Sequence, residues 1–280
     1  MSELLRCLGV LAEPPGTEAK RIAALLELPG TPLGWEYNAI FLEQLYPYAS
    51  AYLDVSGMMG GEARDRIAGF WRALGETPPP EPDHLGTLLG GYANLADAIP
   101  GGADVPVGRA RAAWERARAA FLWEHMLSWL PLWLAKLEQI GTPTYAAWGR
   151  MLGSWIAREA ATLELPEELP THLQAAPALA PPEDDAEAFI SALLSPVRAG
   201  FILTTTDLAN LADAAGVALR AGERRYALKA LLAQDAVATL TGLADLAAAP
   251  PALEGVIGAH WRQRSRRTSR LLSRLAAAAL

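Results

Sequence analysis

Residues 83–95, DHLGTLLGGYANL, carry the clearest signal for the fold of this chain. Their apolar side chains recur every three or four residues, at positions 85, 88, 89, 92 and 95, which places them on one face of an α-helix. The preceding run, Thr77-Pro78-Pro79-Pro80-Glu81-Pro82, is typical of extended chain, and Asp83 can cap the helix that follows. The sequence therefore predicts a one-faced helix that begins at this corner.

The rest of the chain repeats this pattern. Alanine and leucine dominate, alternation of β-branched residues is rare, and strand signals are nearly absent. The sequence therefore predicts an all-α fold, a single bundle-like helical domain with a helical C-terminal extension. The expected helices cover 35–46, 62–74, the segment from Asp83, 107–139 with a kink at Pro131, the segment from Thr142-Pro143, 186–194, 206–215, 222–234, 235–248 and 253 to the end.

Proline content suggests a division of this helical chain. Residues 164–185 hold five prolines and little apolar periodicity, which is typical of a linker. We therefore expect a helical core over 1–163 and a helical C-terminal region over 186–280. A linker of this length would allow helix exchange between two protomers, so a homodimer is an open alternative.

Composition argues against a membrane protein, although 51% of the residues are hydrophobic. No uncharged apolar stretch approaches the roughly 20 residues that a membrane-spanning helix needs. The N-terminal segment carries Glu3 and Arg6 and no cleavage-site pattern, so no signal peptide is expected. A single cysteine, Cys7, excludes an internal disulfide. These observations predict a cytoplasmic protein without stable membrane insertion.

The net charge of −7 hides an uneven distribution. Six arginines and no acidic residue follow position 260, so subtracting their charge leaves −13 on the rest of the chain. An acidic body disfavours nucleic acid as the main partner and suits a basic peptide. The arginine-rich end is either the solvated face of a terminal helix or, as an alternative function, a scaffold surface that docks on membrane or RNA.

Motifs for catalysis or cofactor binding are missing from the sequence. It contains no GxGxxG after a strand, no GxxxxGK[ST], no HExxH and no GxSxG, and its four histidines are scattered. We therefore expect no catalytic residues, no cofactor and no metal. A helical enzyme that holds Mg²⁺ through Asp207 and Asp213 is the alternative, but residues six apart on a helix do not share one ligand face.

Tryptophan is abundant, with nine residues in the chain. Five of them crowd the expected central helices: Trp123, Trp129, Trp133, Trp148 and Trp155. An indole combines a large apolar area with one N–H donor, which suits a peptide-binding groove. Core packing is the competing interpretation, because large aromatic side chains are usually buried.

Three segments taken together resemble the TorD/DmsD/NarJ family of redox-enzyme maturation chaperones. The first is YPYASAYL at 46–53, followed by GMMGGE at 57–62 and by Phe70-Trp71 and Gly75. The second is EPDHL at 81–85, and the third is FLWEHMLSW at 121–129, similar to the family's FLxxHLxxW. The resemblance covers roughly residues 35–160.

This resemblance implies an all-helical fold of the TorD/NarJ type without catalysis. Such chaperones bind the N-terminal leader, often a twin-arginine one, of an apo molybdoenzyme catalytic subunit. They assist insertion of the molybdenum cofactor before export or assembly. The peptide-binding residues that the resemblance implies are Tyr52, Trp71, Pro82, Asp83, His84, His125 and Trp129.

The residues themselves add two expectations to this set. His84 should lie solvent-accessible in the first turn of its helix, beside Asp83 as the cap. Phe121, His125 and Trp129 are spaced four apart and should share one face of a helix.

Overall fold

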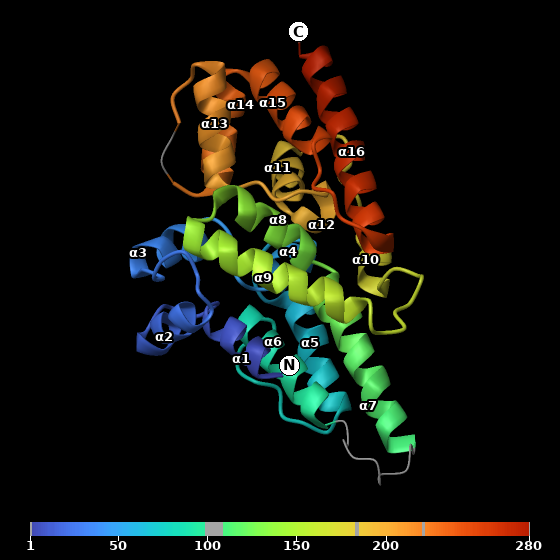
Figure 1. The fold of residues 1–280 in the computed structure, drawn as a ribbon. Helices are drawn as coiled ribbons and strands as arrows, with labels where there is room; N and C mark the ends of the chain where they lie inside the picture. The colour runs from blue at the N-terminus through green and yellow to red at the C-terminus, as the bar shows by residue number, and fades with distance from the viewer. Residues whose placement is uncertain (1, 99–108, 183–184, 220–221, 280) are drawn as a thin grey trace. The chain divides into compact units, whose positions relative to one another are not determined.

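The computed structural model describes residues 2–98, 109–182, 185–219 and 222–279. Within these ranges every regular element is a helix, and the one β-type contact is an isolated antiparallel bridge between Tyr48 and His84. Figure 1 shows the helices in chain order. The all-α prediction is confirmed.

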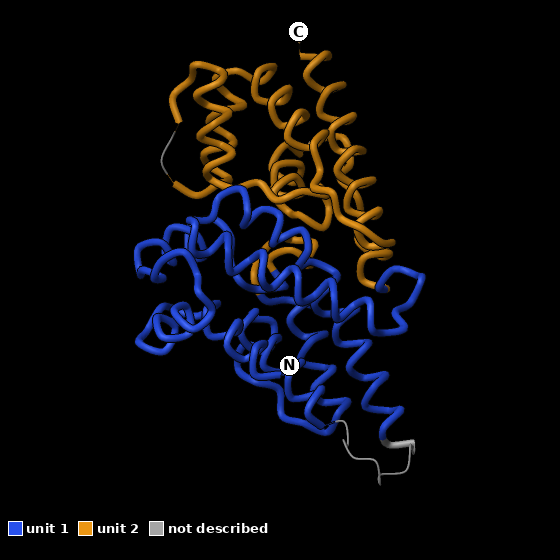
Figure 2. The backbone as a smooth tube through the Cα atoms, viewed as in Figure 1, with its two compact units in different colours: residues 1–50, 60–170 blue, residues 51–59, 171–280 orange. Residues whose placement is uncertain are grey.

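The chain forms two compact units (Figure 2). Unit 1 comprises residues 1–50 and 60–170, and unit 2 comprises residues 51–59 and 171–280. The short segment 51–59 thus belongs with the C-terminal residues although its neighbours on both sides belong to unit 1. The expected division into a core over 1–163, a linker over 164–185 and a C-terminal region over 186–280 stays a prediction.

Unit 1 contains the helices that the sequence pattern marked most strongly. The predicted helices at 62–74 and after Asp83 are confirmed, whereas the two N-terminal helices were not anticipated. The elements are α1 (Ser2–Val10), α2 (Thr17–Leu25), α3 (Gly34–Tyr37), the π-helix η1 (Asn38–Leu42), α5 (Gly61–Ala73), α6 (Leu85–Ala98), α7 (Arg109–Ala120), the π-helix η2 (Phe121–Leu127), α8 (Leu130–Ile140) and α9 (Pro143–Ala160).

The apolar stripe of α6 lies in the core of unit 1. Its leucines at 85, 88 and 89 and Tyr92 are fully buried. Helix α1 packs closely on α6, where Gly9 faces Gly86 so tightly that an added Cβ at Gly9 would lie 3.3 Å from the Gly86 carbonyl oxygen. Two facing glycines therefore bring these helix backbones together.

The expected long helix 107–139 is wrong as a single element. Residues 107 and 108 lie outside the described residues. Helix α7 continues into the π-helix η2, which ends at Leu127, and a new helix, α8, begins at Leu130 after the non-helical residue Trp129. Pro131 lies in the first turn of α8, where its missing N–H breaks no helical hydrogen bond. Proline thus starts a new helix here instead of kinking an old one. The expected helix 35–46 likewise consists of α3 and η1 and ends at Leu42.

The central tryptophans pack inside unit 1. The ring of Phe41 stacks on Trp133 with centroids 5.8 Å apart and meets Trp148 edge-on at 6.0 Å. Both indole N–H groups are used internally, since Trp133 donates to the Tyr46 carbonyl and Trp148 to the Leu8 carbonyl. Core packing is therefore the correct interpretation of these two residues.

Unit 2 is built from several short helices and one long helix. Its elements are α4 (Ser50–Leu53, whose first residue belongs to unit 1), α10 (Thr171–Ala175), α11 (Ala186–Leu194), α12 (Pro196–Ala199), α13 (Thr205–Ala215), α14 (Arg224–Gln234), α15 (Ala236–Ala248) and α16 (Gly255–Ala278). Leu193, Leu208, Leu228 and Leu243 are among the residues of its core. The caps agree with the sequence: Asp235 accepts from the Ala238 N–H, and Gly216 ends α13 in the left-handed region.

Much of the proline-rich segment 164–185 is packed in unit 2. Helix α10 buries Leu173 completely, and the Leu179 N–H donates to the Arg198 carbonyl at 3.0 Å. Segment 51–59 also bonds within this unit, because the Ser195 hydroxyl donates to the Asp54 carbonyl at 3.2 Å. Residues 183 and 184 of the expected linker lie outside the described residues.

Candidate functional site

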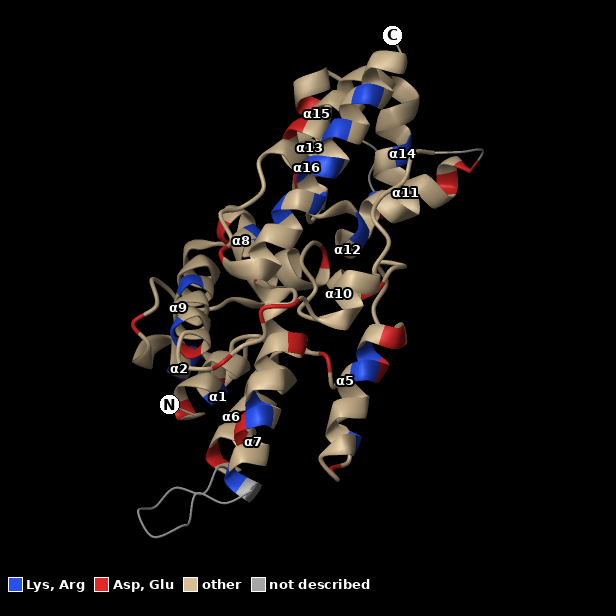
Figure 3. Cartoon of the chain, turned by 90° about the vertical axis from the view of Figure 1, so that its right-hand side faces the viewer, with Lys and Arg blue, Asp and Glu red and all other residues tan. Residues whose placement is uncertain are grey.

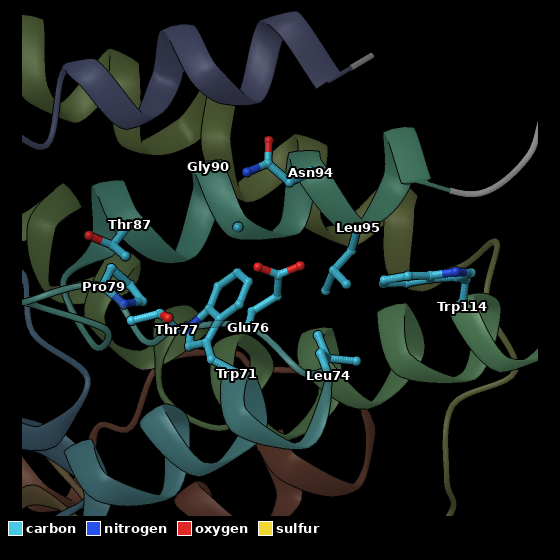
Figure 4. A pocket seen from close by; sticks show the side chains of 11 residues that line it. Trp71, Leu74, Glu76, Thr77, Pro79, Thr87, Gly90, Asn94, Leu95 and Trp114 are labelled. Atoms are coloured by element: carbon cyan, nitrogen blue, oxygen red, sulfur yellow. The ribbon is translucent and has the colours of Figure 1, made fainter.

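Unit 1 contains a cavity of about 480 Å³ between the end of α5, the loop that follows it, α6 and α7 (Figure 4). We call it the α5–α6 cavity. Its lining residues are Trp71, Leu74, Glu76, Thr77, Pro79, Thr87, Gly90, Gly91, Asn94, Leu95 and Trp114.

Local backbone rules shape this cavity. Helix α5 ends at Ala73, and Gly75, with φ of 81°, turns the chain into the proline-rich run that forms one wall. On α6, Gly91 makes room for an indole, because a Cβ there would lie 2.5 Å from the Trp71 ring. A Cβ at Gly90 would meet nothing within 4 Å, so Gly90 forms an open floor. Both glycines are used where side chains would fill the space.

The cavity combines apolar walls with a few polar groups. Figure 4 shows the Trp71 ring, the Leu95 side chain and the Glu76 carboxylate around the same space, with Trp114 at one end. The Trp71 Nε1 atom is buried and has no hydrogen-bond acceptor among the described residues. A ligand that enters with a carbonyl oxygen would satisfy this donor.

Of the seven residues that the resemblance implied, Trp71 lines the cavity. Its ring meets Phe121 edge-on with centroids 5.8 Å apart, which ties the cavity wall to the motif at 121–129. Tyr52 lies in unit 2 and is buried. The other five lie in unit 1 and are also buried.

The corner at Pro82-Asp83-His84 is closed. The expectation that His84 is solvent-accessible is wrong, since 2% of its surface is exposed. The Leu85 N–H donates to the Pro47 carbonyl at 2.8 Å, and the His84 ring meets Tyr48 edge-on with centroids 4.9 Å apart. Segment 47–50 therefore covers the corner that we expected to face a peptide.

Asp83 does not cap α6, which is a second correction. Its carboxylate accepts from the Ser50 hydroxyl and from the Ser50 backbone N–H at 3.4 Å. The first turn of α6 is instead met by His84, whose Nδ1 lies 3.2 Å from the Gly86 N–H and 3.1 Å from a Glu13 carboxylate oxygen. The contact with His84 lowers the pKa of Glu13. Asp83 and His84 therefore connect three separate stretches of the chain, which are represented by Glu13, Ser50 and Gly86.

His125 and Trp129 pack inside the motif at 121–129. The His125 ring meets Phe70 and Phe121 edge-on at 5.2 and 5.5 Å. The Trp129 Nε1 donates to the His125 carbonyl at 2.9 Å. Phe121 and His125 therefore lie side by side as their spacing predicts, whereas Trp129 lies beyond the end of η2, where the backbone leaves helical geometry, so one helix face through all three residues does not form.

Burial keeps His125 neutral and gives a pH-dependent prediction. Burial lowers the pKa of His125 from 6.5 to about 3, and the nearby Arg66 charge adds to this. Below about pH 6.5 the unfolded chain takes up the proton first, so the free energy of unfolding falls as the pH drops from 6.5 towards 3. When the pH is lowered from 7 to 5, the free energy of unfolding should fall by about 2 kcal/mol less in His125→Phe than in the parent chain, because the variant has no imidazole to protonate at this position. Urea unfolding at both pH values measures this, and equal losses would contradict it.

Of the eleven lining residues sequence reasoning found only Trp71 and missed the other ten, Gly90 and Trp114 among them. One signal was available, because adjacent glycines inside a helix each cost about 1 kcal/mol relative to alanine and usually mark close packing or open space. Trp114 gave no such signal, since it lies in the polar, arginine-rich helix α7.

The metal site and the membrane-spanning helix that the sequence analysis considered can be checked on the described parts of the chain. No group of three or more His, Cys, Asp or Glu side chains is placed there to hold a metal ion. Asp207 closes the N-terminus of α13, where its carboxylate accepts from the Thr204 N–H and hydroxyl, both at 2.8 Å. None of the described helices combines the length and apolar character that crossing a bilayer requires.

Comparison with known families agrees with the resemblance in the motifs. Residues 11–135 match the family model described as nitrate reductase delta subunit. This stretch holds every residue that lines the α5–α6 cavity. No curated protein matches the sequence. Over residues 11–135 the chain is thus similar to the nitrate reductase delta subunit family, a chaperone family for molybdoenzyme maturation that includes NarJ/TorD-type proteins.

Proposed function

We propose that this protein is a cytoplasmic chaperone that binds the N-terminal leader of an apo molybdoenzyme catalytic subunit in the α5–α6 cavity. It holds the subunit while the molybdenum cofactor is inserted, before export or assembly. The observation that carries the proposal is the position of this cavity, with its unpaired indole donor, inside the region that matches the chaperone family.

The cavity has groups for the side chains and the backbone of such a leader. Trp71 and Trp114 offer apolar area to leucine-like side chains, and buried aromatic contacts of this kind supply most of the affinity in peptide complexes. The Trp71 N–H would donate to a peptide carbonyl. The exposed Glu76 carboxylate would meet a basic residue, a twin-arginine pair included, and would mainly speed association at low salt.

The buried residues of the expected set act indirectly in this proposal. The carboxylate of Asp83 fixes segment 47–50 through Ser50, and His125 packs against the same phenylalanine, Phe121, that supports Trp71. Pro82 and His84 act with Asp83 at the corner beside segment 47–50, and Trp129 acts with His125 beside Phe121. They set the shape of the cavity while Trp71 touches the peptide.

Filling the cavity tests this function. In Gly90→Leu the new side chain enters the open floor of α6, and we expect binding of the leader peptide to be lost. Because glycine costs about 1 kcal/mol in a helix interior, the same change should raise the stability of the fold. Calorimetric titration with a synthetic leader of a nitrate reductase-type catalytic subunit measures binding, and thermal unfolding measures stability.

Gly69→Leu is the matched control for this experiment. Gly69 also lies inside a helix, α5, where a Cβ would meet nothing within 4 Å, but it does not line the cavity. The control should keep the parent affinity. Equal affinity in the parent chain and Gly90→Leu would show that the peptide binds elsewhere, and no binding to any of the three would reject the function itself.

A further inference from the structure

The long C-terminal helix α16 presents one face made mostly of arginine. With 3.6 residues per turn, its five arginines other than Arg264 fall within an arc of about 140°. Figure 3 shows Lys and Arg positions recurring along α16. These arginines are Arg262, Arg266, Arg267, Arg270 and Arg274, and we call them the arginine face. The opposite side of the helix buries Ile257, Trp261, Ser265, Thr268, Leu271, Leu272 and Ala276.

The arginine face makes no ion pair with the described residues. Helix α16 itself contains no acidic residue. The sixth arginine of the helix, Arg264, is used differently: it turns inward and donates to the carbonyls of Ala176 and Val197. Five positive charges thus lie along thirteen residues, or about 18 Å, of one rigid helix. Mutual repulsion makes this arrangement unfavourable unless an anion covers it.

We propose that the arginine face docks on an anionic phospholipid surface. One guanidinium group can donate two parallel hydrogen bonds to the oxygens of a phosphate. Lipid headgroups are mobile, so they can gather under a convex row of charges without a preformed complementary surface. Unit 2 supplies the rigid support, because the apolar side of α16 is already packed against α15 and α12. The docking is peripheral and reversible by salt, since the other side chains on this face between Arg262 and Arg274, Gln263 and Ser273, are polar and do not insert into the hydrocarbon.

Two other polyanions fit this face less well. Single-stranded nucleic acid is usually held by aromatic rings that stack on its bases, and the one tryptophan of α16, Trp261, is buried. An acidic protein surface would need a concave shape to reach all sides of the arc. Both are arms of the test.

The experiment measures how the full-length chain distributes between solution and sedimented vesicles. Vesicles of phosphatidylcholine alone are compared with vesicles containing about one third phosphatidylglycerol, at low and high salt. The test variant is Arg266→Gln/Arg267→Gln/Arg270→Gln. The control variant is Arg72→Gln/Arg116→Gln/Arg158→Gln, which removes the same net charge from exposed positions in unit 1. Circular dichroism verifies that both variants are folded.

We expect the parent chain to bind the anionic vesicles at low salt and to leave them at high salt. The test variant should lose roughly a hundredfold in partitioning, from about 1 kcal/mol per arginine, while the control variant keeps most of its binding. Binding to both vesicle types alike, or equal losses in the two variants, would overturn the proposal. So would tighter binding to polyuridylate or to polyglutamate than to the anionic vesicles at the same salt. None of these outcomes bears on the α5–α6 cavity, so this inference and the proposed function can fail separately.

Discussion

Gly200→Ala is expected to destabilise unit 2 by roughly 3 kcal/mol or more, from left-handed strain together with overpacking. Gly200 ends α12 with φ of 86°, a conformation that side chains other than glycine rarely adopt. A Cβ at this position would lie 2.2 Å from the Ser265 backbone nitrogen and 2.6 Å from the Arg264 carbonyl carbon. These are backbone atoms of α16, so the clash cannot be relieved by turning a side chain.

Helix α16 is also fixed where the clash would occur. The Arg264 guanidinium donates to the carbonyls of Ala176 and Val197, and the Ser265 hydroxyl donates to the Ala247 carbonyl at 2.8 Å. Moving the helix away from position 200 would break these buried or partly buried hydrogen bonds, each of which contributes about 1 kcal/mol. The strain therefore remains in the folded state.

Gly216→Ala is the matched control for this substitution. Gly216 ends α13 with φ of 65°, but a Cβ there would meet nothing within 4 Å. Only the left-handed backbone penalty applies, so a loss of about 1 kcal/mol is expected. Urea unfolding followed by circular dichroism compares the two variants. Similar losses would mean that α16 moves away from Gly200 at little cost.

The second large effect is expected at a buried ion pair in unit 1. The Glu159 carboxylate on α9 accepts from the Tyr92 hydroxyl at 2.6 Å and pairs with Arg118 on α7 at 3.0 Å. Glu159 is 4% exposed, and Tyr92 is fully buried, which together with its hydrogen bond to Glu159 raises the pKa of Tyr92. Glu159→Leu should cost about 3–5 kcal/mol, because it leaves a largely buried guanidinium without a partner.

Two comparison variants separate this effect from a general loss of salt bridges. Glu138→Leu breaks the pair between Arg150 and Glu138, whose side chains are more than half exposed, and should change stability by less than about 1 kcal/mol. Arg118→Met combined with Glu159→Leu removes both charges and should recover much of the loss. Chemical denaturation measures all of these variants, and a double variant as unstable as Glu159→Leu alone would reject the explanation.

Local chemistry explains why much of the fold could be predicted from the sequence. The proline at 143, the cap at Asp235 and the left-handed Gly216 act through neighbours within a few residues, so their patterns determine the same helix ends in any context. The apolar stripe of α6 was equally readable, because its spacing matches the helical period whatever it packs against.

The rest depended on contacts between distant parts of the chain. His84 looked accessible because nothing in 81–85 reveals that Tyr48 and Glu13 lie against it. The π-helix at 121–127 has no reliable local pattern, and it ends before Trp129, which therefore does not continue the face of Phe121 and His125. Trp71 was found through a motif, but Trp114 was not, because a cavity is formed by helices that the sequence does not show to be neighbours.

The grouping of segment 51–59 with unit 2 affects how the protein folds during synthesis and where it can be truncated. During synthesis on the ribosome, Asp54 leaves the exit tunnel about 140 residues before Ser195, the hydroxyl donor that it meets in the finished fold. An early stretch of nascent chain thus stays incomplete until translation is well past its midpoint. An expression fragment that ends at Pro170 would keep segment 51–59 but lack the rest of unit 2, with which this segment is grouped. Pro170 is therefore a poor place to truncate the protein.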